Sequence, residues 1–254
     1  MFESATVANN NALNRQRLDK RISQALNISR KDVKRLLAKQ EISVDGVTTQ
    51  NADEIVNKFS KIIVKTQLLP FEEAYYLMLN KPKGVVSATK DDKHQTVINL
   101  LNFPYKNELH IVGRLDLNST GLILLTNDSR WSEQITNPSA KVEKQYLVTV
   151  DKPITQDYAT AFAQGMYFEY ENATTLPAQL EILTSYKALV IIQEGKYHQI
   201  KRMFGRFQNK VLSIHRISVG HITLDKNLKA GDSRSLSVEE INNNYKNNNF
   251  AGKF

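Results

Sequence analysis

The stretch that most constrains the fold is residues 113–128, which read GRLDLNSTGLILLTND. Its apolar run, Leu122–Leu125, follows Asn, Ser, Thr and Gly, a pattern that predicts a buried strand entered through a turn. We expect a short strand before that turn, with Asp116 at its end. Because side chains alternate faces along a strand, Arg114 and Asp116 would project from the same face. A carboxylate held beside a permanent cation stays ionised, which is what a nucleophilic carboxylate needs.

Two other interpretations of this stretch are open on its residues alone. An aspartate followed by Asn, Ser, Thr and Gly is common turn chemistry, so the stretch could be a plain hairpin. Asp116, Asn118 and Thr120 also match the first three ligand positions of a calcium-binding EF-hand loop. The calcium interpretation fails further along, because position twelve is Asn127 instead of a bidentate glutamate and the flanking run is strand-like instead of helical.

Composition and charge exclude several kinds of site and favour one kind of partner. The 254 residues include no cysteine, which excludes disulfides, thiolate zinc sites and cysteine nucleophiles. The five histidines show no tight ligand spacing, so we expect no metal site. Of a net charge of +8, residues 15–39 carry +7 and residues 194–216 carry +5, which leaves −4 for the rest. A solvated helix face would explain either patch alone, but two patches on an acidic body indicate a polyanion-binding protein.

The sequence also bears on location and assembly. No apolar run approaches the length of a membrane span, and the N-terminus lacks the apolar core of a signal peptide. We therefore expect a cytoplasmic protein with no membrane partner. Nothing in the sequence indicates more than a monomer.

Residues 15–64 are predicted to form a small domain of two helices and a hairpin. Apolar residues recur at helical spacing over Arg17–Leu26. Ser29, with Asp32 three residues later, forms a capping box for a second helix. The dipeptide Asp45–Gly46 then separates two short strands, as in a two-residue hairpin turn.

This helix–helix–hairpin pattern resembles the S4 RNA-binding domain. The resemblance implies that its exposed cations meet phosphates, which gives affinity and placement but little sequence information. The expected RNA-binding residues are Arg15, Arg17, Arg30, Lys31, Lys34 and Arg35.

Residues 75–241 are predicted to form a larger α+β domain. Strand patterns lie at 75–79, 109–112, 122–126, 146–150, 178–183, 188–193, 211–215 and 221–224, and helical patterns near 96–101, 129–135, 156–163 and 198–207. Because strands do not alternate strictly with helices, we expect a largely antiparallel sheet.

The remaining segments are predicted to lie outside both domains. Residues 65–74 contain Pro70 and are expected to be a linker. Residues 1–14 and 242–254 are rich in asparagine and are expected to be flexible tails.

The whole string from residue 113 to residue 128 resembles the active-site motif of the RNA pseudouridine synthases. NKPKGVVSA (80–88), KQYLV (144–148) and EGKYHQIKRMF (194–204) support the resemblance, which covers about residues 15–240. More narrowly, the chain is similar to the branch that modifies a single uridine, the 516 site, in 16S (small-subunit) ribosomal RNA. The resemblance implies an S4-like domain followed by a catalytic domain with a bent, mainly antiparallel mixed sheet.

The resemblance also implies roles for individual residues. Asp116 would be the catalytic carboxylate, and Arg114 would fill the gap left when the target nucleotide flips out of its stack. Tyr146 would lie against the target base and assist proton removal. Without the motif, Tyr146 would be interpreted as a half-buried tyrosine of a sheet.

Three neighbouring residues receive roles in the same way. Lys201 would pair with the catalytic aspartate and hold it in place, and Ile200 would line the pocket. Arg202 would contact RNA. The alternative is that Lys201 and Arg202 are solvated helix charges and that Ile200 belongs to the core.

The expected function is isomerisation of one uridine to pseudouridine, without a cofactor or a metal. The expected partner is 16S ribosomal RNA or a small-subunit assembly intermediate. Two alternatives are a sister synthase acting on 23S ribosomal RNA and a non-catalytic S4-type RNA-binding or ribosome-assembly factor. The acid at Asp116 argues against a pure binding protein, because a carboxylate that faces a polyanion would lower its affinity.

Overall fold

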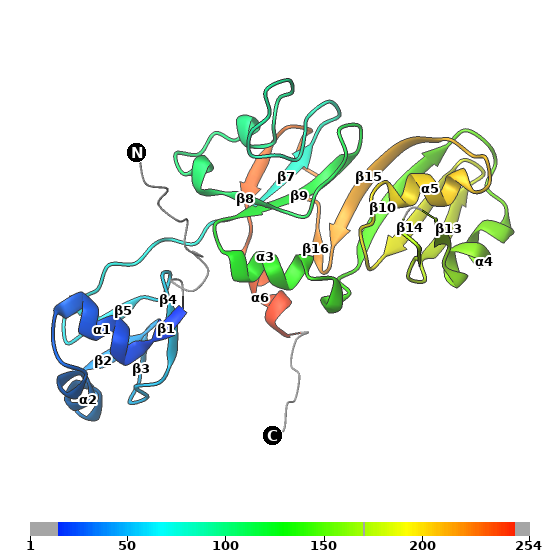
Figure 1. Cartoon of the computed structure of the whole chain (residues 1–254). Coiled ribbons are helices and arrows are strands. Elements are labelled where there is room, and N and C mark those ends of the chain that lie inside the picture. The colour runs from blue at the N-terminus through cyan, green and yellow to red at the C-terminus, as the bar shows by residue number, and fades with distance from the viewer. Residues whose placement is uncertain (1–14, 170, 247–254) are drawn as a thin grey trace, which may run out of the picture. The chain divides into compact units, whose positions relative to one another are not determined.

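The computed structural model describes residues 15–169 and 171–246 (Figure 1). The chain divides into two compact units, residues 1–74 and residues 75–254. Each unit has a hydrophobic core of its own. The predicted N-terminal tail, residues 1–14, lies outside the described residues.

The N-terminal unit packs two short helices on an antiparallel sheet. Its elements are β1 (Arg15–Arg17), α1 (Leu18–Leu26), α2 (Arg30–Ala38), β2 (Ile42–Val44), β3 (Val47–Thr48), β4 (Ile55–Asn57), β5 (Ile62–Val64) and β6 (Gln67–Leu68). The main sheet has the order β3-β2-β5-β6, and β1 pairs separately with β4. Leu18, Ile22 and Leu37 are buried in one core with Ile42 and Ile62, so the apolar stripes of both helices face the sheet.

Local sequence signals explain where these elements begin and turn. Ser29 Oγ accepts a hydrogen bond from the Asp32 backbone N–H at 3.2 Å, which confirms the predicted cap of α2. Asp45 and Gly46 have φ angles of 51° and 85°, the left-handed pair that a tight hairpin turn requires. The predicted hairpin between β2 and β3 is therefore confirmed as well.

The first half of the predicted linker belongs to the N-terminal unit instead. Leu68 pairs with Ile63 in the ladder between β6 and β5, and Leu69 is only 2% exposed. Lys65 takes a φ of 57°, so a tight turn returns the chain to the sheet before Pro70. The expectation of a linker over 65–74 was wrong for residues 65–69, because burial of a leucine side chain, about 1.5–3 kcal/mol, holds this segment on the core.

The C-terminal unit is built on a mixed sheet of nine strands in the described residues, with the order β13-β14-β10-β15-β9-β7-β17, β16 beside β15 and β8 beside β9. The strands are β7 (Tyr76–Lys81), β8 (His110–Val112), β9 (Thr120–Thr126), β10 (Lys144–Val150), β13 (Gln179–Thr184), β14 (Lys187–Ile192), β15 (Val211–Val219), β16 (Ile222–Thr223) and β17 (Ser233–Ser235). A separate short ribbon joins β11 (Tyr167–Phe168) to β12 (Ala173–Thr174). The predicted combination of helices with a mainly antiparallel mixed sheet is confirmed.

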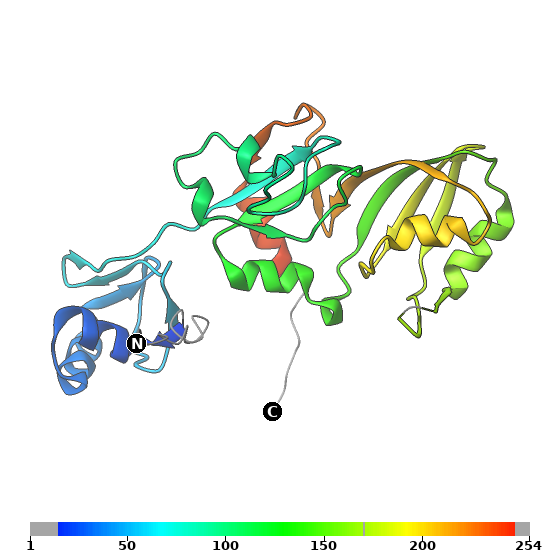
Figure 2. The same cartoon turned by 45° about the horizontal axis from the view of Figure 1, so that its top comes forward.

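The helices of this unit are α3 (Ser129–Thr136), α4 (Gln156–Gln164), α5 (Gln199–Gly205) and α6 (Val238–Lys246). The 3-10 turns are η1 (Ile98–Leu100), η2 (Lys106–Glu108) and η3 (Pro138–Ala140). The helix expected near 96–101 is thus only a short 3-10 turn. Figure 2 shows α4 and α5 on the same face of the β10–β14–β13 half of the sheet.

The sheet consists of two halves that meet at β9 and β15 (Figure 1). These two strands run parallel and pair only through His215 with Thr120 and Arg216 with Gly121. The other strand pairs in the described part of the chain are antiparallel. A Cβ added to Gly121 would lie 2.3 Å from the Arg216 carbonyl oxygen, and its φ is +101°. Only a glycine allows the two halves to approach this closely.

The apolar run Leu122–Leu125 is buried on both faces of the sheet. Ile123 and Leu125 lie in the larger core, which α4 and α5 also enter. Leu122 and Leu124 lie in a second core with Trp131 of α3. A strand covered on both faces needs apolar residues at every position, which explains why the run does not alternate.

The helix α6 extends into the predicted C-terminal tail. Ser237 Oγ accepts from the Glu240 backbone N–H at 3.2 Å, and Glu240 accepts from the Ser237 N–H at 2.7 Å, so a capping box starts a helix. The helix runs to Lys246. The predicted tail was therefore wrong for residues 242–246, and residues 247–254 lie outside the described part of the chain.

Candidate active site

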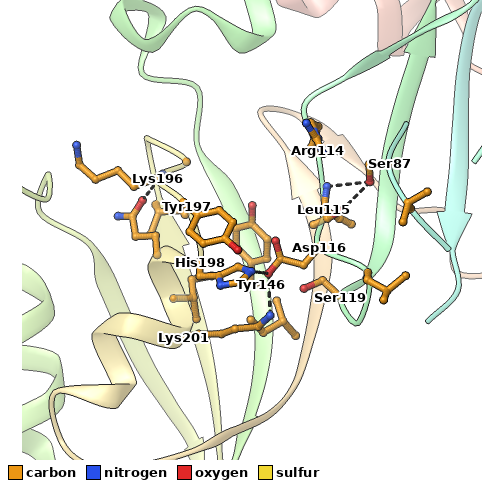
Figure 3. Close-up of a pocket in the computed structure, with 17 residues that line it drawn as sticks. Ser87, Arg114, Leu115, Asp116, Ser119, Tyr146, Lys196, Tyr197, His198 and Lys201 are labelled. Atoms are coloured by element: carbon orange, nitrogen blue, oxygen red, sulfur yellow. Dashed lines mark hydrogen bonds and ion pairs between the residues drawn. The ribbon is translucent and has the colours of Figure 1, made fainter. Parts of the chain in front are cut away.

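A pocket of about 570 Å³ opens beside the junction of the two half-sheets (Figure 3). Its walls come from the loop between β8 and β9, from β10, and from residues 195–201 at the start of α5. Ligand pockets commonly measure about 300–1,000 Å³, so a nucleoside fits within this volume. The predicted site residues that line it are Arg114, Asp116, Tyr146, Ile200 and Lys201.

The sequence predicts Asp116 at the end of a strand, but in the structure Asp116 lies in a loop. β8 ends at Val112, and Gly113 follows with a φ of 76°, which turns the chain out of the ladder. Ser87 Oγ then replaces a strand partner, because it accepts from the Leu115 N–H at 3.0 Å and donates to the Leu115 carbonyl at 2.8 Å. With Leu115 buried in the core, the residue before Asp116 is fixed through both its backbone and its side chain.

A fully buried lysine fixes the other end of this loop. Lys81 Nζ donates to the carbonyl oxygens of Pro82 at 3.0 Å, Leu117 at 3.2 Å and Ser119 at 2.7 Å. Burial lowers the pKa of the Lys81 ammonium to about 8, while the negative charge of Asp116 acts in the opposite direction. The three carbonyls give each ammonium proton an acceptor, so the lysine holds the loop from beneath.

Two basic side chains approach the same oxygen of Asp116. Lys201 Nζ donates to Oδ2 at 2.8 Å, and His198 Nε2 lies 3.5 Å from that atom. The Asp116 and Lys201 side chains are about one-third exposed, so the pair is open to the pocket. No hydrogen bond or ion pair from the described residues reaches Oδ1, which is available to a ligand. Strand alternation predicts Arg114 as the cation beside Asp116, whereas in the structure the cation in contact with Asp116 is Lys201.

Arg114 lies instead on the rim of the pocket (Figure 3). Its side chain is exposed and makes no hydrogen bond or ion pair with the described residues. Arg114 and Asp116 therefore serve one pocket without contacting each other. A free guanidinium at this position can bind phosphate or stack on a base.

Tyr146 and Ile200 form the apolar wall of the pocket. Tyr146 is 7% exposed and projects from β10 into the larger core at a β-bulge between Gln145 and Tyr146. Ile200 is 5% exposed on α5. These side chains give the pocket an apolar surface beside the carboxylate of Asp116.

The loop before α5 contributes residues that sequence reasoning missed. Gln199 donates to Glu194 at 2.8 Å and accepts from the Lys196 N–H at 3.0 Å, which ties the two ends of the loop together. His198 takes a φ of 51°. Its Nε2 lies 3.5 Å from Asp116 Oδ2, and the Tyr197 ring stacks on its ring. The string EGKYHQIKRMF was singled out as a motif, but no local signal could reveal that His198 faces a carboxylate far away in the sequence.

The predicted RNA-binding cations fall into two groups. Arg202 donates to both oxygens of Glu171 and lies 3.6 Å above the ring of Phe168, and this pairing holds the pKa of Glu171 below its ordinary value. In the N-terminal unit, Arg17 is paired with Asp19, and Arg35 with Asp32. The other predicted cations of that unit, Arg15, Arg30, Lys31 and Lys34, are exposed and have no side-chain hydrogen bond or ion pair to described residues.

The described residues offer neither a metal site nor a membrane-spanning helix. No group of three His, Asp or Glu side chains in residues 15–169 and 171–246 is arranged to hold a metal ion. Of the helices in the same residues, none has the length and apolar character needed to span a bilayer.

Comparison with known proteins gives consistent matches along most of the chain. Residues 75–205 match a family model described as RNA pseudouridylate synthase. The protein from Pseudomonas aeruginosa named ribosomal small subunit pseudouridine synthase A is 45% identical over 226 residues, 89% of this chain and 98% of that protein. The Escherichia coli protein of the same name is 41% identical over 226 residues, with 89% and 98% covered. A crystal structure of a pseudouridylate synthase superposes with a TM-score of 0.66 at 37% identity, and covers 90% of this chain and 99% of its own.

Proposed function

This chain belongs to the RNA pseudouridylate synthase family, and we propose that the uridine it isomerises lies in small-subunit ribosomal RNA. The names of its relatives in Pseudomonas aeruginosa and Escherichia coli support this choice of substrate. By the sequence resemblance, the position is the 516 site of 16S ribosomal RNA. The reaction breaks the N1–C1′ glycosidic bond, turns the uracil and rejoins it to C1′ through C5. C5 loses its proton and N1 gains one, so no atom is gained or lost overall.

Asp116 is the group we assign to this chemistry. The single observation that carries the assignment is its geometry: Oδ2 is held by Lys201 at 2.8 Å while Oδ1 has no partner among the described residues. An ionised carboxylate with one fixed and one free oxygen suits attack on an electron-poor carbon, or stabilisation of positive charge that develops there.

The pocket walls suit a base that has left its stack. Tyr146 offers a ring against which a uracil can stack and a hydroxyl that can accept or donate a proton. Arg114, exposed on the rim, is placed to occupy the gap left in the RNA and to contact phosphate. Flipping a nucleotide costs a few kcal/mol, and an inserted guanidinium that stacks offsets part of that cost.

The N-terminal unit is proposed to be an S4-like RNA-binding domain. Its two helices and hairpin match that pattern, and α2 presents Arg30, Lys31 and Lys34 to solvent without ion-pair partners in the described residues. Such cations bind phosphates and add affinity that depends on salt. The specific chemistry then belongs to the pocket of the C-terminal unit.

The test of this function compares Asp116→Asn with the unchanged protein. The substitution keeps size and shape but removes the charge, so pseudouridine formation in small-subunit rRNA should fall to background. RNA affinity should stay within about threefold, because a carboxylate does not attract a polyanion. A Lys187→Met variant, changed at an exposed position of β14, serves as the matched control for handling and folding.

Mapping of pseudouridines in total ribosomal RNA, with and without this protein, identifies the site. We expect one position in the small-subunit RNA to depend on the protein. Residual turnover by Asp116→Asn would remove the carboxylate from its assigned role. A dependent position in the large-subunit RNA would favour the sister-enzyme alternative instead.

A further inference from the structure

Tyr197 is an aromatic residue that is exposed and yet held in place. It is 75% exposed, the largest value among the exposed apolar and aromatic side chains of the described residues. Its ring nevertheless stacks on the His198 ring, with centroids 3.8 Å apart and planes 23° apart. One face of the ring is therefore covered, and the other is open at the mouth of the pocket (Figure 3).

The support beneath this ring is tied to the surrounding structure by several contacts. His198 is anchored between Asp116 and the start of α5, with Nε2 3.5 Å from the Asp116 carboxylate. The loop that carries both rings is closed by Gln199, which bonds the Glu194 carboxylate and the Lys196 backbone. Glu194 in turn accepts from the Leu176 N–H at 2.9 Å. A platform that is fixed before the ligand arrives loses little entropy on binding.

Charge around the platform suits a nucleic acid. Arg114, whose side chain has no hydrogen bond or ion pair among the described residues, lines the same pocket. Lys196 is also a pocket residue, and its only ion pair in the described structure, with Glu194, is long at 3.7 Å. A flat aromatic face between cations is how proteins bind unpaired bases with little regard to their identity.

We propose that the open face of Tyr197 stacks on the nucleobase next to the target uridine, outside the pocket that receives the uridine itself. The proposal rests on the proposed function only in that the ligand is RNA with one nucleotide turned into the pocket. Tyr197 then acts as a binding residue: it holds the strand in position after the target base has left its stack, and it takes over stacking that the neighbouring base has lost. Each such stack is worth about fivefold to a hundredfold in affinity.

The test measures RNA affinity and single-turnover rate for variants of the full chain. The probe is a synthetic small-subunit rRNA fragment centred on the mapped uridine. We expect Tyr197→Ala to raise the Kd at least fivefold and Tyr197→Phe to stay within twofold, because phenylalanine keeps the ring. Tyr197→Leu, which covers His198 without an aromatic face, should behave like Tyr197→Ala. The matched control is Tyr186→Ala, at an exposed tyrosine outside the pocket lining, which should not change the Kd.

A double-mutant cycle, with one change in the protein and one in the RNA, locates the stacked base. In two further probes, the nucleotide on the 5′ or on the 3′ side of the target is abasic. On the stacked side, the abasic change should weaken binding to the unchanged protein at least fivefold and to Tyr197→Ala less than twofold, since the contact can be lost only once. Full additivity on both sides, or Tyr197→Ala binding at the wild-type Kd, would overturn the proposal. A fall in rate at saturating RNA with unchanged Kd would do so too, because it would mean that the ring only shields the ion pair of Asp116.

The same measurements in Asp116→Asn separate this proposal from the proposed function. The stacking effect is read from Kd and does not need turnover. If the changes in Kd from Tyr197→Ala and from the abasic nucleotide are non-additive but no pseudouridine forms in the fragment, the assigned reaction is wrong and the stacking site is supported. If pseudouridine forms and the two changes in binding free energy add, only the proposed stacking site is wrong.

Discussion

Removing the ammonium of Lys201 should slow pseudouridine formation without weakening RNA binding. Lys201 Nζ lies 2.8 Å from Asp116 Oδ2. At that distance two unit charges attract by about 6 kcal/mol at an effective dielectric constant of 20 and by about 1.5 kcal/mol in water. The pair is about one-third exposed in the free protein. When bound RNA covers the pocket, its value rises to that of a hydrogen bond between charged groups, about 2 kcal/mol. If that energy serves to orient the carboxylate in the transition state, Lys201→Met should be about 30-fold slower.

The assay is single-turnover conversion of small-subunit rRNA at saturating enzyme, which excludes effects on binding. Lys201→Arg keeps a cation and should recover most of the rate, whereas Lys187→Met, which removes an exposed lysine from β14, should match the unchanged protein. The melting temperature should change little, because partly exposed ion pairs add only about 0–1 kcal/mol to stability. A Lys201→Met rate within threefold of the unchanged protein would refute the claim that this ion pair positions Asp116.

Three further predictions concern the fold, the buried lysine and the RNA-binding helix. Gly121→Ala places a Cβ 2.3 Å from the Arg216 carbonyl oxygen at a φ of +101°. Urea denaturation should therefore show that the free energy of unfolding falls by about 2–5 kcal/mol. An unchanged unfolding midpoint would contradict the close approach of β9 and β15. Burial lowers the pKa of Lys81 from 10.5 to about 8, so between these pH values the unfolded chain holds this proton and the folded chain has lost it. The free energy of unfolding, measured relative to Lys81→Met, should therefore rise from pH 8 to 10.5 by up to about 3 kcal/mol. A difference that stays constant with pH would count against this pKa shift. Replacing both Lys31 and Lys34 on α2 with alanine should reduce the slope of log Kd against log salt by about 1.5–2 and leave the single-turnover rate unchanged, and an equal slope would argue against phosphate contacts there.

Elements that depend on nearby residues were predictable from the sequence. Ser29 caps α2 three residues from its partner Asp32, and Asp45–Gly46 makes a turn from its own φ preferences. The run Leu122–Leu125 predicted a buried strand, because four consecutive apolar side chains have no favourable place in water. In these cases the physical cause lies within a few positions of the residue that it explains.

The predictions that failed concern segments whose position depends on distant contacts. Leu69 is held by the core of the N-terminal unit, so composition alone misassigned its segment as linker. The helix α6 begins at a capping box, but Glu240 is also bound by Arg234 of β17, an interaction that the asparagine-rich sequence does not reveal. Asp116 lies outside the predicted strand, because Gly113 turns the chain out of the ladder at a φ of 76°.

The sequence by itself determined the buried strand at Leu122–Leu125, the cap at Ser29 and the turn at Asp45–Gly46, and its motif order pointed to the family of the enzyme. The family resemblance implied that Lys201 pairs with Asp116, but only the tertiary structure decided the geometry of that pair and the support of the loop around it. Lys201 reaches Asp116 from 85 residues away, Lys81 holds Ser119 across 38 residues, and Ser87 holds Leu115 across 28. None of these contacts has a local signature, because each joins segments far apart in the sequence. The sheet brings these segments together, and the buried backbone polar groups of the loop then need partners other than water.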